Sequence, residues 1–279
     1  MPDAGEIRVG PAGWSYDDWK GTVYPEAVRR FDPLGYLAGF FDTIEVNSSF
    51  YRIPPPGHAR SWVGRVSGNE RFWFTTKLYR GFTHNATFPS TEEIEACHAY
   101  LAPLLDAGRL GAVLAQFPWS FRDGPDARHR ISAIRDAFPD VPLAVEIRHG
   151  SFANDEFFSF LDDNGVGFAN IDQPIIGDSF RPTSIVTGPV GYVRFHGRNR
   201  EKWFDHDEAW ERYDYIYTAD ELAPWIDRIR AVAAKKDVYV VTNNHFRGQA
   251  IVNAVELKRG LGQDAPVPPT LSMHYGDRF

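Results

Sequence analysis

Charged and amide side chains recur where the short apolar segments of this chain end. Glu146 and Arg148 follow Leu143–Val145, and Arg194 and His196 end a second such segment. Carboxylates and imidazoles transfer protons, and a guanidinium group binds carboxylate or phosphate through two parallel hydrogen bonds. The pattern therefore predicts proton-transfer chemistry beside groups that bind anions.

The polar residues at the segment ends mostly share one parity, although it is unclear after the last segment. Side chains alternate along a strand, so residues i and i+2 point to one face. The strands of a parallel barrel are buried on both faces, and barrel enzymes carry their chemistry at the C-terminal strand ends. We predict one pocket there, formed by Glu45, Asn47, Lys77, Gln116, Glu146, Arg148, Asp172, Arg194, His196, Asn243 and Asn244.

Strand-like and helix-like segments alternate along the 279 residues. The predicted strands are Ile7–Gly10, Thr43–Val46, Phe72–Thr76, Ala112–Phe117, Leu143–Ile147, Gly167–Asp172, Gly191–His196 and Val238–Thr242. The predicted helices are Pro33–Phe41, His58–Val66, Thr91–Leu105, Ala127–Ala137, Asp155–Asp163, Ala219–Lys235 and Ala250–Leu261. This alternation favours an α/β, (β/α)8 TIM-barrel-like fold. An open doubly wound sheet is the alternative, but no GxGxxG or P-loop motif supports it.

We predict a single barrel domain over residues 1–279, with its core at about residues 7–262. The connection from Asp172 to Val190 has no convincing helical pattern, so the barrel is expected to be irregular between strands six and seven. Residues 263–279 are rich in proline and are expected to form an extended C-terminal tail.

Composition limits the classes of partner. The net charge is −7, with 30 basic and 37 acidic residues, so no nucleic-acid partner is expected. No apolar stretch reaches the ~18 residues that a membrane span needs. Residues 1–8 lack the layout of a signal peptide, and the single cysteine, Cys97, is expected to be buried and inert. We therefore expect a cytoplasmic protein without a membrane partner.

Several segments together resemble the domain-of-unknown-function 72 family, also called YecE-like. They are Gly10–Tyr16 (GPAGWSY), Glu45–Tyr51 (EVNSSFY) with Pro54, Lys77 with Thr83 and His84, Gln116–Pro118, Glu146–His149, Arg194–Gly197, and Asn243 with Asn244. The resemblance runs over about residues 7–261 and implies a TIM-barrel-like fold, but no particular activity. Trp14, Tyr51 and His84 lie in these segments and complete the predicted substrate-binding set.

Two departures from the family pattern are visible. Pro11 and Ala12 stand where the family commonly has Thr-Ser, and Thr242 stands where an aromatic residue usually precedes the Asn pair. Neither departure affects a charged residue, but both lie where they would reshape the wall of the pocket.

The residue types favour an enzyme of the hydrolase, lyase or isomerase type. Glu146 is the first candidate for a general acid or base, since a carboxylate among cations keeps its charged form, and His196 is the second. Lys77 would stabilise a developing negative charge. The excess of cations over carboxylates, with Arg8 counted in the cavity, favours a small anionic or polyhydroxylated ligand. Glycoside hydrolysis by Glu45 and Glu146 is one version of this hypothesis.

Metal and cofactor chemistry is not expected. Potential ligands are present, namely Glu146, His149, Asp172, His196 and His245, but no HxH or HExxH spacing accompanies them, and the cationic neighbours disfavour a bound metal ion. We therefore predict neither a metal nor another cofactor.

Three alternatives remain open. The aromatic-rich segment Arg198–Thr218 should overhang the site, either as a lid or as a packed surface excursion. The same pocket would also suit a non-catalytic small-molecule binding or sensor protein. Exposed aromatic residues would instead suit a platform for a protein partner.

Overall fold

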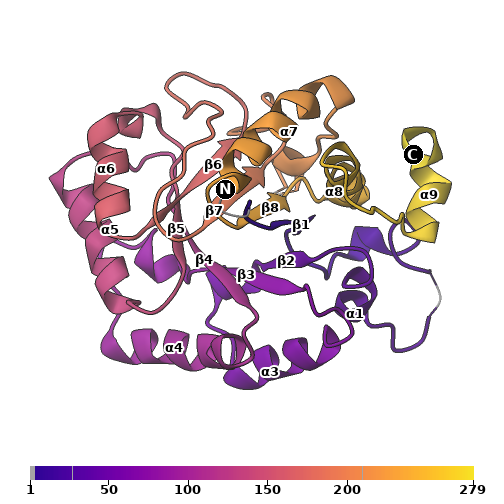
Figure 1. Ribbon diagram of the computed structural model, residues 1–279, viewed down its shortest axis with the longest axis horizontal. Coiled ribbons are helices and arrows are strands. Elements are labelled where there is room, and N and C mark those ends of the chain that lie inside the picture. The colour runs from indigo at the N-terminus through magenta and orange to yellow at the C-terminus, as the bar shows by residue number, and fades with distance from the viewer. Residues whose placement is uncertain (1–3, 27, 209) are drawn as a thin grey trace.

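The chain folds as a parallel eight-stranded barrel surrounded by helices (Figure 1). The computed structural model describes residues 4–26, 28–208 and 210–279. Neighbouring strands follow the order β1-β8-β7-β6-β5-β4-β3-β2, and a bridge between Ala12 and Glu45 joins the two ends of this sheet. The (β/α)8 TIM-barrel-like prediction is confirmed. The strands are β1 (Ile7–Pro11), β2 (Thr43–Val46), β3 (Trp73–Lys77), β4 (Leu110–Gln116), β5 (Leu143–Glu146), β6 (Gly167–Asp172), β7 (Gly191–Phe195) and β8 (Val238–Thr242).

Helices cover the outside of the barrel, with α3 beside α4 and α7 against α8 (Figure 1). They are α1 (Pro33–Leu37), α2 (Ser48–Tyr51), α3 (Pro56–Arg65), α4 (Thr91–Asp106), α5 (Pro125–Ala137), α6 (Asp155–Asp163), α7 (Ala219–Ala233), α8 (Gln249–Gly260) and α9 (Pro269–Tyr275). Ser90 and Thr218 are the N-caps of α4 and α7. Each side chain accepts a hydrogen bond from the backbone N–H of a glutamate three residues later, Glu93 or Glu221, whose carboxylate accepts one from the N-cap backbone N–H. Residues 173–190 contain no helix, as predicted.

The C-terminal tail is not the extended segment that the sequence suggested. Residues Pro269–Tyr275 form α9, with Pro269 at the first helical position. Proline suits that position because its fixed φ matches the helix and its missing N–H has no intrahelical partner there. Leu271 is fully buried and anchors the helix. The proline content therefore starts a helix here, and the prediction of an extended tail is wrong from residue 269 on, whereas residues 263–268 form no helix.

The buried apolar side chains form two groups. The larger group lies between the strands and the helices. The smaller group fills the interior of the barrel with small residues from β4, β5 and β6 opposite tyrosines from β7 and β8. Its members are Ala12, Ala112, Leu114, Ala144, Ala169, Val190, Tyr192, Tyr239 and Val241. Toward the C-terminal strand ends, the interior side chains become polar.

Two glycines allow close approaches inside this barrel. A Cβ at Gly10 would lie 1.8 Å from Thr43 O, where β1 meets β2 and the barrel closes. A Cβ at Gly111 would lie 2.2 Å from Cζ of Tyr239. The ring of Tyr239 therefore fits into the barrel interior beside the start of β4, because Gly111 has no side chain there.

We predict that Gly111→Ala lowers the free energy of unfolding by about 1–3 kcal/mol, as overpacking of a filled core does. The ring of Tyr239 has to move, and it lies against the guanidinium group of Arg8. Urea denaturation measures the change. The control is Gly64→Ala on the exposed side of α3, where the added Cβ meets nothing within 4 Å. That variant should gain roughly 0.5–1 kcal/mol; equal effects at both positions would contradict the packing argument.

Candidate functional site

Polar side chains from five strands and three strand-following residues meet inside the barrel near its C-terminal end. We call them the central polar cluster, and its members are Glu45, Lys77, Gln116, Glu146, Arg148, Arg194, His196 and Asn243. All of them except Gln116 are buried. The structure thus brings together most of the residues predicted to form one site.

Arg194 on β7 connects two carboxylates across the barrel. Its Nε and Nη2 donate to Glu45 over 3.1 and 2.7 Å, and its Nη1 donates to Glu146 over 2.9 Å. Tyr192 adds a hydrogen bond from its hydroxyl to Glu45 Oε2 over 2.8 Å. The side chain of Arg194 is only 1% exposed. Such a bidentate, charge-assisted contact is strong and fixes the relative positions of the strands that carry it.

Glu146 at the end of β5 accepts hydrogen bonds from three cationic or polar groups. Oε1 accepts from Arg148 Nε at 2.9 Å and from His196 Nε2 at 3.0 Å, and Oε2 accepts from Arg194. Burial alone raises the pKa of this carboxyl, but His196, Arg194 and Arg148 outweigh burial and hold its pKa well below the usual range. Glu146 is therefore an ionised anchor for its neighbours.

His196 follows β7 and is fully buried. Burial, together with the charges of Arg148 and Arg194, lowers its pKa to about 3 against the opposing effect of Glu146. Nε2 faces Glu146, and Nδ1 lies 3.2 Å from Nδ2 of Asn243. These partners assign a neutral ring that carries its proton on Nε2.

Lys77 at the end of β3 has a different environment. Its Nζ donates to Gln116 Oε1 over 2.8 Å and lies 3.9 Å from the ring centroid of Phe50. Within the described parts of the chain, no carboxylate oxygen lies within 4.0 Å of Nζ. Burial, together with the charge of Arg194, lowers the pKa of Lys77 to about 7, and the two carboxylates of the cluster only partly oppose this shift. The lysine therefore titrates near neutral pH.

The segment after β7 covers the cluster. Trp203 is 4% exposed, its ring centroid lies 5.6 Å from the Arg148 guanidinium, and its edge-on contact with His196 spans 6.2 Å. The segment is held at one end by Arg198, which donates two hydrogen bonds of 2.8 and 2.7 Å to Asp172. Trp203 therefore lies over Arg148 and His196 and contributes to the burial of this side of the cluster.

Asp172 and Asn244 were predicted to line the pocket, and these placements are wrong. Ala169 faces the barrel interior, so Asp172, with the opposite parity on β6, faces the helices. There it also accepts from Trp225 Nε1 at 2.7 Å. Asn244 donates to Tyr215 O over 2.8 Å and supports the covering segment. Both residues therefore form hydrogen bonds to the segment that follows β7 and do not line the interior of the barrel.

Arg8 lies at the opposite end of the barrel, against the prediction that it shares the cavity. It is at the start of β1, and its guanidinium pairs with Glu6 and Asp237 at 2.5 and 3.2 Å. The parity of Arg8 was compatible with the interior, but its position along the strand was not. The N-terminal end of the barrel thus has a separate ion-pair group.

Four other predicted site residues, Trp14, Asn47, Tyr51 and His84, have no side-chain hydrogen bond to the cluster among the described residues. Trp14 and Asn47 line a cavity of about 210 Å³ together with Gly13, Ser15, Tyr16 and Ser48. The Oδ1 atom of Asn47 is buried and has no hydrogen-bond partner among the described residues. Tyr51 on α2 is 70% exposed. Burial, together with the charges of Lys77 and Arg80, lowers the pKa of half-buried His84 to about 4.

Three contacts were missed at the level of sequence. Tyr192 shares the parity of Arg194, two residues earlier on β7, and that signal was available. Phe50 lies in a segment that resembles the DUF72 pattern, but its contact with the Lys77 ammonium depends on the turn of α2. Trp203 lies in a long irregular segment, and its contacts require the tertiary structure.

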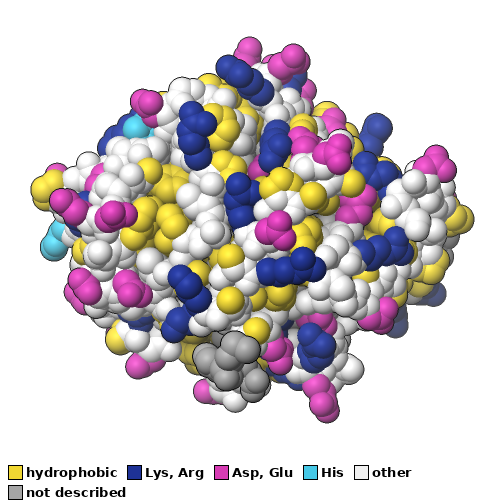
Figure 2. Space-filling view, turned by 45° about the horizontal axis from the view of Figure 1, so that its top comes forward, with side chains coloured by type: hydrophobic (Ala, Val, Ile, Leu, Met, Phe, Trp, Pro, Cys, Tyr) yellow, Lys and Arg dark blue, Asp and Glu magenta, His cyan; other side chains and the backbone are white. Residues whose placement is uncertain are grey.

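Within residues 4–26, 28–208 and 210–279, no group of three or more His, Cys, Asp or Glu side chains is placed to hold a metal ion. None of the helices in these ranges combines the length and apolar composition that crossing a membrane requires. Figure 2 shows basic, acidic and apolar side chains interspersed over one face of the molecule.

The fold and the cluster together define a class. An α/β barrel with charged residues gathered inside its C-terminal end has the arrangement in which TIM-barrel proteins carry their sites. Over residues 8–273 the chain matches the family described as "Protein of unknown function DUF72", and it belongs to that family.

Relatives extend this assignment over nearly the whole chain. UPF0759 protein YunF of Bacillus subtilis (strain 168) is 30% identical over 267 residues, which is 90% of this chain and 93% of that protein. The crystal structure of a DUF72 family protein from Thermotoga maritima MSB8 has a TM-score of 0.79 and 34% identity, covering 92% of this chain and 100% of that chain. For a DUF72 family protein from Enterococcus faecalis V583 the values are 0.81 and 28%, covering 94% and 98%.

We predict that Glu146→Gln costs about 3–5 kcal/mol at pH 7, because it leaves buried arginine charge without a carboxylate. The pKa of Glu146 is depressed, so its stabilisation is present above the unfolded pKa of about 4.3 and is lost as pH falls through the lower folded value. The difference between variant and parent in urea denaturation should therefore shrink below about pH 4.

The control is Glu6→Gln at the other end of the barrel. Glu6 also pairs with a buried arginine, but its side chain is 56% exposed. Its loss should cost about 1 kcal/mol or less. If Glu146→Gln costs as little as this control, Glu146 is not the anchor described above.

Proposed function

We propose that this protein is an enzyme that acts on a small anionic or polyhydroxylated substrate at the central polar cluster. The observation that carries the proposal is a buried lysine that has no carboxylate partner among the described residues, placed among ion-paired charges at the C-terminal end of a barrel. Buried charges are costly unless paired, so a retained lysine of this kind favours chemistry over packing.

The geometry favours Lys77 over Glu146 as the group that transfers a proton. A general acid or base works best when its pKa is near the working pH, and the pKa of Lys77 is about 7. Glu146 is held ionised by three donors, which suits the positioning of Arg148 and His196. The first choice of catalytic residue therefore moves from β5 to β3.

The charges of the cluster favour an anionic ligand. Glu45 and Glu146 balance Arg148 and Arg194, so a protonated Lys77 leaves one positive charge. Arg148 has five N–H donors, and within the described residues it donates only through Nε to Glu146, apart from a 3.5 Å contact of Nη2 with His196. Its other donors remain for a carboxylate, a phosphate or sugar hydroxyls.

Substrate entry requires the covering segment to move. Trp203 covers Arg148 and His196 in the cluster. The salt bridge from Arg198 to Asp172 would hold one end of the segment fixed while Trp203 moves. Opening and closing of this kind is common where a barrel loop excludes water from its site. The exposed aromatics Tyr51 and Phe204 lie on segments that follow β2 and β7, at the same end as the cluster, which supports a ligand site more than an outer-surface platform.

The test is a ligand screen followed by an assay for turnover. The purified protein is examined by thermal shift against sugar acids, sugar phosphates, hydroxy acids and neutral sugars. Each compound that stabilises it is then followed by proton NMR in D2O for exchange or conversion. Turnover supports the enzyme; stabilisation without exchange or conversion supports the sensor alternative and contradicts the proposal. No response to any compound also counts against it.

We predict that Lys77→Met abolishes turnover and raises stability at pH 7 by about 1–4 kcal/mol, as the replacement of other buried ionic groups has done. The pKa of Lys77 falls from an unfolded value of about 10.4 to about 7 in the fold. The charged form is therefore disfavoured in the folded state, and this cost grows as pH decreases from about 10 to 7. The gain should disappear near pH 10.

The matched control is Lys258→Met. Lys258 is as buried as Lys77, but its Nζ lies 3.6 Å from Asp42 Oδ2 and donates to Phe40 O over 3.0 Å. Its replacement should destabilise the protein and leave turnover unchanged per folded molecule. Urea denaturation at pH 7 and pH 10 measures both variants, and a large loss for Lys77→Met would mean that Lys77 is structural.

A further inference from the structure

We propose that Lys77 is a covalent catalytic residue that forms an imine with an aldehyde or ketone substrate carrying an anionic group. This inference rests on the proposed function and names its substrate class. It differs from the general proposal because a proton-transfer lysine needs no bond to its substrate, whereas an imine can be trapped chemically.

The first observation is the set of contacts of the amine. A lysine ammonium has three N–H donors, and Lys77 has one acceptor, Gln116 Oε1, within the described residues. The aromatic face of Phe50 lies on another side at 3.9 Å. The ring face attracts an ammonium ion, but it does not replace hydrogen-bond acceptors, and the single acceptor satisfies a neutral amine with a free lone pair better than the three donors of an ammonium ion. Burial and the nearby Arg194 lower the pKa of Lys77 accordingly, which is how buried lysine nucleophiles are activated.

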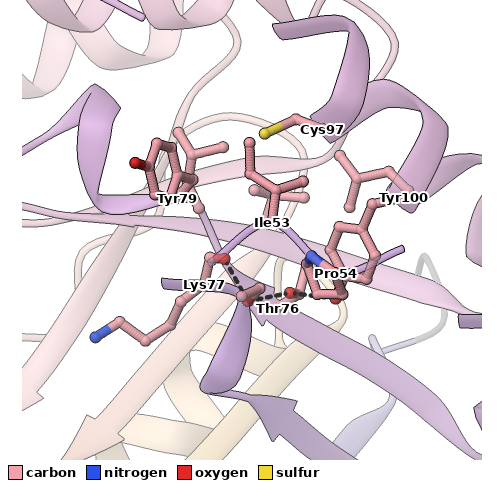
Figure 3. A pocket seen from close by; sticks show the side chains of 11 residues that line it. Ile53, Pro54, Thr76, Lys77, Tyr79, Cys97 and Tyr100 are labelled. Atoms are coloured by element: carbon pink, nitrogen blue, oxygen red, sulfur yellow. Dashed lines mark hydrogen bonds between the residues drawn. The ribbon is translucent and has the colours of Figure 1, made fainter. Parts of the chain in front are cut away.

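The second observation is that the backbone under the amine is rigid. Ser49 Oγ lies 2.7 Å from Lys77 O and 2.9 Å from Thr76 Oγ1, which is 2.8 Å from the hydroxyl of Tyr100. Figure 3 shows these hydrogen bonds, and it shows the Lys77 side chain extending away from Cys97 and Tyr100. The strand end is thus fixed from the helix side, and the amine is directed away from that side toward the cluster.

The third observation is the contrast with Lys258, which is also buried, at 5% exposure. Its ammonium is paired with Asp42 and the carbonyl of Phe40, which directly precede β2. A buried lysine whose role is structural has such partners. The carboxylates near Lys77 are already paired with Arg148 and Arg194. The contacts of Lys77 therefore give it no structural role like that of Lys258, and we assign it a chemical one.

The chemical step balances within the lysine and its substrate. The Nζ lone pair attacks the carbonyl carbon, and the C–N bond forms while the carbonyl electrons move to oxygen. The oxygen then leaves as water with the two hydrogens of the amine, and a C=N bond remains. No oxidant or reductant takes part. The imine nitrogen takes up one further proton from water, and the resulting positive charge lies near Glu45 and Glu146, the two carboxylates that oppose the lowering of the Lys77 pKa.

The anionic group of the substrate follows from the arginines. Arg148 acts electrostatically on Lys77, and its unused N–H donors suit a carboxylate or phosphate next to the carbonyl group. A neutral aldehyde lacks this contact. The expected class is therefore an oxo compound with a carboxylate or phosphate on a neighbouring carbon.

The experiment is reductive trapping at pH 7 with sodium cyanoborohydride. Glyoxylate, glycolaldehyde phosphate and glycolaldehyde are the carboxylate, phosphate and neutral probes, and peptide mass mapping locates the modification. The chain has six lysines, so the other five are internal controls. Lys77 should be labelled at least about tenfold faster than exposed Lys235 and Lys236, because far more of it is neutral amine at this pH. The two anionic probes should label Lys77 faster than the neutral probe, and Arg148→Met should remove that difference in rate.

Access to the cluster is controlled with Trp203→Ala, which opens the cover and should speed labelling of Lys77. Labelling of Lys77 no faster than Lys235 in both the parent and Trp203→Ala overturns the inference. If Lys77-dependent turnover of a screened compound is found without trapping, the imine is wrong and the proposed enzyme stands. If neither trapping nor any ligand response occurs, both fail.

Discussion

The guanidinium group of Arg194 is the contact on which the interior of this barrel depends. It is almost fully buried and joins Glu45 on β2 to Glu146 on β5, so one side chain of β7 fixes two other strands. Breaking such a buried ion pair on one side leaves a charge without compensation, which costs far more than a surface pair contributes. Glu146 extends the same network to Arg148 and His196. The strand ends are thereby tied together by electrostatic contacts rather than by apolar packing.

The layer below makes this network possible. Alanines and glycine on β4, β5 and β6 leave space that the tyrosines of β7 and β8 fill, and Tyr192 reaches from that layer to Glu45. The hydroxyl of Tyr192 also reaches Thr75 Oγ1 at 2.9 Å, so the lower surface of the cluster is satisfied by hydrogen bonds. The hydrogen bonds of the network are therefore satisfied on the side that faces Tyr192, and its free N–H donors lie at the C-terminal strand ends. This is where Arg148 contacts Trp203, and it is the side from which a ligand would arrive.

The alternation of the sequence was sufficient for the barrel and for the residues of the cluster on β3, β4, β5 and β7. A parity rule identifies them because strands pleat regularly and their C-terminal ends share one end of a barrel. The rule failed for Asp172 because the parity of β6 must be set by its interior residue, Ala169, and a polar side chain gives no sign of which face it occupies. It failed for Arg8 because parity does not give depth along the barrel axis. The helix α9 was missed because prolines mark extended chain and helix starts alike.

What sequence patterns could not separate were the roles of Glu146 and Lys77, because both are charged residues at the C-terminal ends of barrel strands. The difference lies in how many partners each one has. Glu146 has three donors and remains ionised, so its charge contributes to the fold. Lys77 has one acceptor in the part of the chain that the structure describes and is close to losing its proton, so its charge opposes the fold. Sequences that specify a structure usually agree at every level, and the positions that disagree are where function is expected. In this barrel the amine of Lys77 is such a position, and the residues around it hold it in place without neutralising it.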